Sequence, residues 1–92
     1  MTSIIDGRIE SAVIAARLRL ATDLSRKTGE PIIQYCFDLI DWVLTGERKP
    51  VAAPTLEARA AVRAAVNVGL RECFGSENPD GLESVRVRRD SL

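Results

Sequence analysis

The chain contains no histidine. Histidine is the commonest general base and a frequent metal ligand, so its absence removes the usual components of a catalytic triad and of many metal centres. The sequence also lacks a Gly-rich phosphate loop and a nucleophile elbow. We therefore predict that this 92-residue protein is not an enzyme and uses no cofactor.

Cysteine is scarce as well. Cys36 and Cys73 are too far apart in the sequence to provide the close ligand pairs of a structural zinc site. Both lie inside apolar helical patterns, where a free thiol behaves as a small hydrophobic side chain. We predict buried free thiols, as in a reducing compartment; a disulfide between the two is the alternative.

The chain has neither an excess of one charge nor a long apolar run. Thirteen basic residues balance 13 acidic ones, so bulk charge gives no reason to expect binding to nucleic acid or to a membrane. No stretch approaches the roughly 20 apolar residues of a membrane span, and the charged N-terminal region does not resemble a signal peptide. We predict a cytoplasmic protein. Because Lys27 and Lys49 are the only lysines, the arginine-rich composition hints at a GC-rich bacterial or phage genome.

The clearest positive feature is the segment 31-45. Its polar residues recur at spacings of four, three and four, and every other residue after Pro31 is apolar. At 3.6 residues per turn the polar side chains form one narrow stripe, so we predict a helix that is buried around about two-thirds of its circumference. The expected exposed residues are Gln34, Asp38, Asp41 and Thr45. The expected core residues are Ile33, Cys36, Phe37, Ile40 and Val43.

Two further helices are predicted on either side of it. The first covers about 4-27, begins at Ser3 and stops at Gly29. Besides a main apolar stripe, it carries a second stripe of Ile14, Leu18 and Ala21 on roughly the opposite side. The third covers about 55-74 and stops at Gly75. Its small core residues would let a neighbouring helix approach closely. They are Ala58, Val62, Ala65, Val66, Gly69, Leu70 and Cys73.

The tail, 76-92, is polar and rich in turn signals, among them Asn78-Pro79 and Asp80-Gly81. After these turns, Val85 to Arg88 alternates like a strand, although a short fourth helix is the alternative. We expect the tail to pack back by burying apolar surface and to dock its arginines on acidic residues of the second helix; the alternative is that it presents these arginines to an acidic partner or to phosphates. The apolar residues are Leu82, Val85 and Val87, and the acidic ones are Asp38 and Asp41. The predicted fold is a single all-α domain of three helices, the first pair antiparallel, with this C-terminal segment, a short helix or strand, packing back.

Two surfaces are candidates for binding a protein partner. The second stripe of the first helix is left over once a three-helix core has formed, and the tail, a second copy or another protein could cover it. Tyr35 and Trp42 border the acidic stripe of the second helix, and aromatic residues beside polar ones are typical of interfaces. A merely solvated stripe is the alternative. The candidate partner-binding residues are Ile14, Leu18, Tyr35, Asp38, Asp41 and Trp42.

Arginines suggest a different surface, suited to phosphates. Some recur every four residues on the third helix and others lie in the tail. They are Arg59, Arg63, Arg71, Arg86, Arg88 and Arg89. Nearby acids favour ordinary solvation instead. A helix-turn-helix motif is disfavoured, because the helix after the short connection at 28-30 is mostly apolar with acids in its polar stripe.

These observations favour a non-catalytic interaction module. We expect it to regulate, inhibit or assemble with another macromolecule, as a homodimer or a small hetero-complex. Short helical chains of this kind are common among phage and mobile-element products, but no residue motif assigns this chain to them. The alternative from another class is a small DNA- or RNA-binding regulator that uses the arginines of the third helix and the tail.

Overall fold

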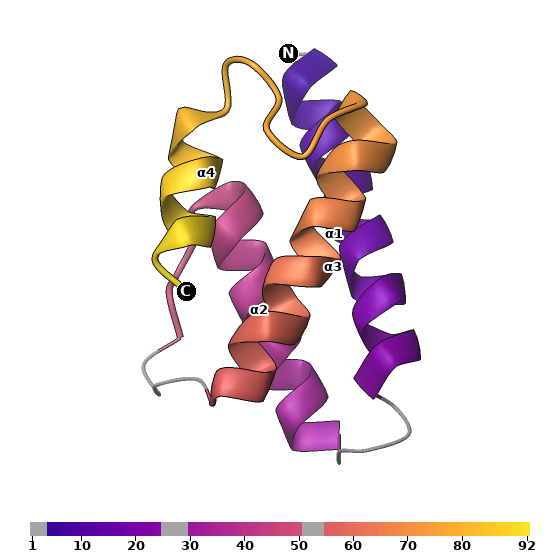
Figure 1. The fold of residues 1–92 in the computed structure, drawn as a ribbon, viewed down its shortest axis with the longest axis vertical. Helices are drawn as coiled ribbons and strands as arrows, with labels where there is room; N and C mark the ends of the chain where they lie inside the picture. Colours follow the sequence, from indigo (N-terminus) through magenta and orange to yellow (C-terminus); the bar gives the residue numbers. More distant parts are fainter. Residues whose placement is uncertain (1–3, 25–29, 51–54) are drawn as a thin grey trace.

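The computed structural model describes residues 4–24, 30–50 and 55–92. The four helices in these ranges are α1 (Ile4–Leu24), α2 (Glu30–Thr45), α3 (Leu56–Phe74) and α4 (Glu83–Asp90) (Figure 1). The described residues contain no strand, so the predicted all-α fold is confirmed and the tail forms a helix. The predicted start of the first helix at Ser3 and its end at Gly29 lie outside the described residues.

The helices do not simply alternate in direction. In Figure 1, α1 runs antiparallel to both α2 and α3, whereas α2 and α3 run the same way. The predicted antiparallel first pair is therefore present. Because α2 and α3 begin at the same end of the molecule, the chain after α2 has to return along its length, and residues 46–50 lead in that direction. This return explains why the connection after α2 is longer than a turn.

The burial of α2 follows the sequence pattern closely. Cys36, Ile40 and Val43 are buried as predicted, whereas Ile33 and Phe37 are half-buried at the edge of the core. The polar stripe faces outward, except that one of its members, Asp41, is half-buried. Leu39 and Leu44 are buried in addition to the expected residues. A helix with a single polar stripe thus lies at the centre of the fold, in contact with α1, α3 and α4.

The most extensive helix contact joins α1 and α3, and small residues make it possible. A Cβ placed on Gly69 would lie 2.6 Å from the carbonyl oxygen of Ala12, so the two backbones touch where glycine allows it. The predicted core face of α3 is buried, except that Cys73 is half-buried. Thr55 caps the start of α3, where its hydroxyl accepts from the Ala58 N–H at 3.1 Å, and Gly75 in the left-handed conformation caps its end.

The tail packs back onto α2 through α4. Leu82 and Val85 are buried as predicted, and so is Leu92. The prediction for Val87 is wrong, because its side chain is 64% exposed. In a strand Val85 and Val87 would share a face, but in a helix residues two apart point in directions about 200° apart. Helix formation thus turns Val87 to the outside and brings Arg89 inward.

Candidate functional site

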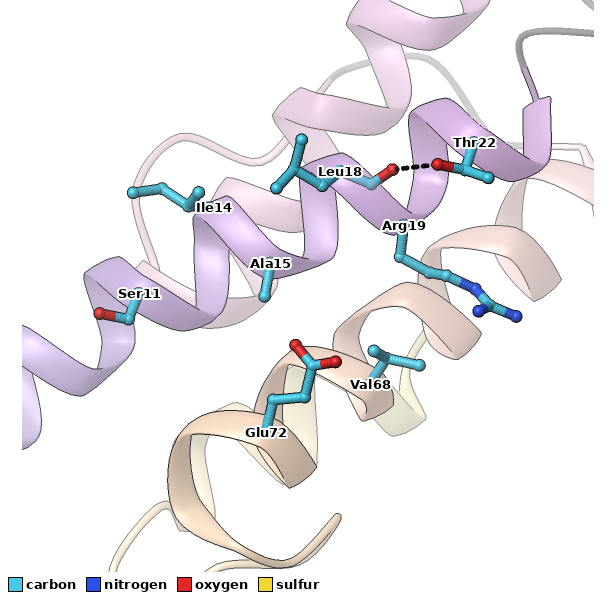
Figure 2. Close-up of a pocket in the computed structure, with 8 residues that line it drawn as sticks. All are labelled: Ser11, Ile14, Ala15, Leu18, Arg19, Thr22, Val68 and Glu72. Atoms are coloured by element: carbon cyan, nitrogen blue, oxygen red, sulfur yellow. Dashed lines mark hydrogen bonds between the residues drawn. The ribbon is translucent and has the colours of Figure 1, made fainter.

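Ile14 and Leu18 lie on the side of α1 that faces away from the core. Their side chains are 61% and 66% exposed, although both are large and apolar. They line a shallow groove between α1 and α3 with a volume of about 460 Å³, shown in Figure 2. The wall on the α3 side is formed by Val68 and Glu72. Of the predicted second stripe of the first helix, Ile14 and Leu18 are therefore exposed, whereas Ala21 is half-buried.

We use the name "outer face of α1" for the uncharged surface formed by Ser11, Ile14, Leu18, Ala21 and Thr22. Its two hydroxyl groups are already bonded to their own helix. Ser11 donates to the carbonyl of Gly7 at 3.2 Å, and Thr22 donates to the carbonyl of Leu18 at 3.0 Å. Because these donors already have partners, covering the face with a protein would leave no hydroxyl hydrogen unsatisfied.

The tail does not cover this face. In Figure 1, α4 lies on the opposite side of the molecule from α1, against α2. Ile14 and Leu18 are exposed with the tail fully in place. Tail coverage, one of the three explanations of the second stripe, is thereby excluded, and cover by a second copy or by another protein stays a prediction.

The acidic stripe of α2 is partly occupied by the chain's own side chains. Asp41 forms an ion pair with Arg17 of α1 at 2.5 Å, and the Arg17 guanidinium also lies 5.3 Å from the centre of the Phe37 ring. Asp38 accepts from Gln34 at 3.3 Å. The prediction that the tail arginines dock on these acids is wrong, because α1 supplies the cation for Asp41.

The two aromatic residues beside the stripe are half-buried. Tyr35 and Trp42 both pack against the core, and burial raises the pKa of the Tyr35 phenol. Lys49 lies 4.8 Å from the centre of the Trp42 ring, a cation–π contact that partly covers it. A pocket of about 180 Å³ lies between the segment after α2 and the acidic residues of that helix. It is lined by Asp38, Asp41, Glu47, Arg48 and Pro50. The Arg17–Asp41 pair separates this region from the outer face of α1, so the structure does not join the two candidate surfaces.

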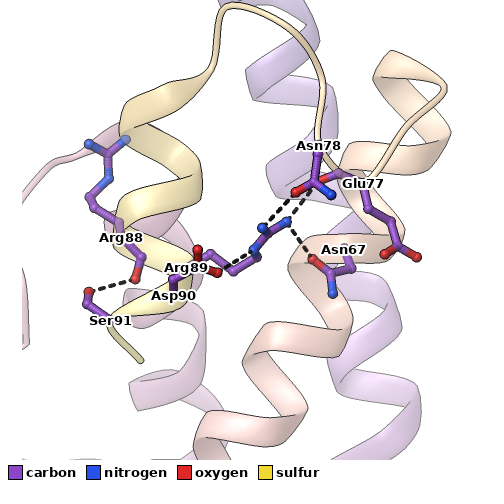
Figure 3. Close-up of polar contacts among 7 residues, drawn as sticks. All are labelled: Asn67, Glu77, Asn78, Arg88, Arg89, Asp90 and Ser91. Carbon is purple, nitrogen blue, oxygen red and sulfur yellow. Dashed lines mark hydrogen bonds and ion pairs between the residues drawn. The ribbon is translucent and has the colours of Figure 1, made fainter.

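Among the arginines that the structure describes, Arg89 is the most buried, with 9% exposure. Figure 3 shows its guanidinium between α3 and the loop that precedes α4. It donates to the Asn67 side chain at 3.2 Å, to the Glu77 carbonyl at 2.8 Å and to the Asn78 side chain at 2.8 Å. A side chain with these contacts fixes the loop and α4 to the body of the protein, and it is not available to a phosphate.

The neighbouring Arg88 reaches the end of α2 instead. Its Nε donates to the carbonyl of Val43 at 2.9 Å, and a Cβ added to Gly46 would lie 3.3 Å from its guanidinium carbon. The last carbonyls of a helix have no partner within the helix and carry the negative end of its dipole. Arg88 therefore acts as a tertiary C-terminal cap for α2, a role that the sequence alone did not reveal.

The remaining arginines of the predicted phosphate-binding set are mostly engaged. Arg59 donates to the carbonyl of Leu92 at 3.4 Å. Arg71 forms an ion pair with Glu77, and Arg86 with Glu83. Within the residues that the structure describes, Arg63 is the member of the set that is exposed and has no partner. A dedicated basic surface is thus not assembled, although exposed ion pairs can open.

The cysteines are two free thiols, Cys36 buried and Cys73 half-buried. Burial raises the pKa of both, and for Cys73 the nearby carboxylate of Glu72 adds to the rise while Arg8 opposes it. Each therefore stays protonated at neutral pH, where a thiol is a weak nucleophile. Across the described ranges, no three His, Cys, Asp or Glu side chains gather as metal ligands would. In the same ranges, no helix has the length and apolarity to cross a membrane.

No protein-family model matches this chain, and no curated protein or solved structure is detectably similar to it. Its function therefore has to be inferred from its own residues and their geometry.

Proposed function

We propose that this protein is a non-catalytic interaction module whose binding surface is the outer face of α1. The observation that carries the proposal is the exposure of Ile14 and Leu18, which lie one helical turn apart and line the groove between α1 and α3. Other large exposed apolar side chains, such as Leu56 and Val87, lie on separate elements. Single exposed apolar residues are normal, but an adjacent pair beside a groove is typical of a protein-binding site.

The proposed activity is to regulate, inhibit or assemble with another macromolecule through this face. The low reactivity of the thiols and the lack of histidine support a role without catalysis. On composition alone we propose a cytoplasmic protein of bacterial or phage origin. The acidic stripe is a less favoured surface, because Arg17 and Lys49 already contact it.

The alternative of a DNA- or RNA-binding regulator has weaker support. Phosphate binding would need arginines that are free to leave their present partners, but Arg88 and Arg89 are held by backbone and amide oxygens inside the fold. Salt-dependent retention on a nucleic acid column tests this alternative directly. An interaction through the outer face of α1 should show no such retention.

The test of the proposal is affinity purification from the cells that produce the protein, with Leu18→Asp as the disrupting variant. Val87→Asp is the matched control, since Val87 has nearly the same exposure but lies on α4. A bound protein should be retained by the wild type and by the Val87 variant and lost with Leu18→Asp. The retained protein should bind the wild type again when the two are purified separately and then mixed. Equal retention by all three forms would contradict the proposal.

A further inference from the structure

We infer that α4 covers a second binding surface, on α2, and that an amphipathic helix of a partner protein displaces α4 from it. This surface is separate from the outer face of α1, so the inference does not rest on the proposed function. We use the name "strap" for residues 82–92, which contain α4 and the buried side chains of Leu82, Val85 and Leu92. Figure 1 shows the strap on the outer side of α2, reached from α3 by a loop across the top of the view.

The strap is attached mainly to one helix. The helices α1, α2 and α3 all contact one another, whereas α4 packs chiefly against α2 and is bonded to α3 through Arg89. Within α4 only Val85 and Arg89 are buried, and its other residues are half-buried or exposed. A segment with few buried side chains opens at a lower cost than the core unfolds. The strap can therefore leave α2 while the three long helices stay together.

The strap does not fill the surface on which it lies. A groove of about 330 Å³ runs between α4, the end of α2 and the neighbouring part of α1. Its lining includes Ile9 of α1, Leu44 of α2 and Val85 of α4. An apolar side chain larger than valine at the position of Val85 would extend into this groove and bury more apolar surface. A partner helix that carries such a residue would bind α2 more tightly than the chain's own strap does.

Two unpaired donors weaken the closed contact. The Nε atoms of Arg59 and Arg86 are buried and have no hydrogen-bond partner among the residues that the structure describes. Arg86 belongs to α4, and Arg59 of α3 donates through another nitrogen to the Leu92 carbonyl at 3.4 Å. A buried donor without a partner costs free energy that hydration returns. Opening of the strap is favoured to that extent.

The contacts of the strap define the chemistry of the partner. The surface accepts the apolar side chains of Leu82 and Val85, and Arg88 donates to the Val43 carbonyl near the end of α2. These three residues follow one another at spacings of three, so they share one side of the segment. The basic residue is placed where the negative end of the α2 dipole favours it. The partner segment is therefore a short amphipathic helix with two apolar residues three apart, the second larger than valine, and an arginine or lysine three residues later.

Fluorescence anisotropy with the full chain and a labelled synthetic peptide of residues 79–92 tests the inference. Arg89→Ala loosens the chain's own strap, while the peptide keeps its arginine and its apolar residues. Since apparent affinity rises with the population of the open form, this variant should bind the peptide at least about fivefold more tightly than the wild type. Arg63→Ala is the matched control, because Arg63 is exposed on α3 away from these contacts, and it should bind as the wild type does.

Variant peptides test the fit to the groove. Val85→Leu in the peptide should tighten binding to the Arg89→Ala chain about threefold to fourfold, because one more buried methylene group fills the groove. Val85→Asp in the peptide should abolish binding. Equal affinity of all three peptides would show that the peptide does not lie where α4 lies, and would overturn the inference.

Hydrogen exchange of the wild type tests the opening without any substitution. The amides of α4 should exchange through an opening that leaves α1, α2 and α3 protected. Exchange of α4 only at the rate of global unfolding would overturn the inference, and so would the absence of peptide binding to a folded Arg89→Ala chain. Neither result bears on the outer face of α1, whose own test uses Leu18→Asp.

Discussion

The α1–α3 contact and the α2–α4 contact hold helices together by different means. In the first, the missing side chain of Gly69 lets α3 lie against the backbone of α1. In the second, Leu82 and Val85 bury apolar surface, and Arg88 of α4 donates to the Val43 carbonyl of α2, while the neighbouring Arg89 holds α4 to α3 and to the loop before it. The first contact gains its free energy from close apolar packing, whereas the second combines apolar burial with hydrogen bonds to groups that would otherwise be unpaired.

This difference has consequences for substitutions. An apolar contact responds to volume, because a missing or an added methyl group leaves a cavity or forces a shift. A polar contact responds to the number of hydrogen bonds left unmade. Substitutions that change only side-chain volume therefore test the α1–α3 contact. Substitutions that remove only hydrogen-bond donors test the contacts of α4.

The largest effect is expected at Ile40, which is fully buried in α2, the helix that contacts all the others. Ile40→Ala should lower the free energy of unfolding by about 2–5 kcal/mol, because it removes buried apolar surface and leaves a cavity. Asp38→Ala, on the exposed stripe of the same helix, should change it by less than about 0.5 kcal/mol. Urea unfolding curves give both values. A larger loss for Asp38 than for Ile40 would mean that the orientation of α2 is wrong.

The next effect tests the α1–α3 contact itself. Gly69→Ala should destabilise the protein by about 1–3 kcal/mol, because the new Cβ meets the Ala12 carbonyl and the helices must move apart. Gly7→Ala is the matched control, since a Cβ there has no neighbour within 4 Å. It should stabilise α1 by about 0.5–1 kcal/mol through helix propensity. If both substitutions stabilise the protein in thermal melts, the close approach at Gly69 is absent.

The third prediction concerns the hydrogen bonds of Arg89. Arg89→Ala should cost about 1–3 kcal/mol, because the oxygens of Asn67, Glu77 and Asn78 lose their donor. Hydrogen exchange should accelerate mainly in α4 and in the loop before it, since α1 and α3 keep their own contact. Arg89→Lys should be only a partial replacement, because one ammonium lacks the planar fork of donors. Uniform acceleration over the whole chain would indicate that α4 is not a separate unit.

The smallest effect is expected at the cap of α2. Arg88→Ala should cost about 0.5–1 kcal/mol, the usual value of a cation near a helix C-terminus, and the loss should shrink at high salt. Arg63→Ala, an exposed arginine without a partner in the described part of the chain, should have an effect within about 0.5 kcal/mol of zero. Equal effects of the two substitutions at low salt would argue against the Arg88 cap.

The exposure of Ile14 and Leu18 on α1 depends both on the local sequence pattern and on the tertiary structure. The periodicity of α1 alone predicted that Ile14 and Leu18 would lie outside a three-helix core, and they do. Whether the tail would cover them could not be read from the sequence, because that depends on where the chain leads after α3. The structure places α4 on the far side, against α2.

The sequence by itself determined the three long helices and most of their core residues, whereas it left the tail open between a strand and a helix. The polar stripe of α2 and the core face of α3 follow from the 3.6-residue period, because the position of a residue along a helix fixes the direction of its side chain. The tertiary structure alone decided the roles of the arginines and of Val87. Arg88 and Arg89 are neighbours in the sequence, but on a helix they point about 100° apart. Their acceptors come from α2, from α3 and from the loop before α4, and only the packing of distant segments brings these oxygens within reach.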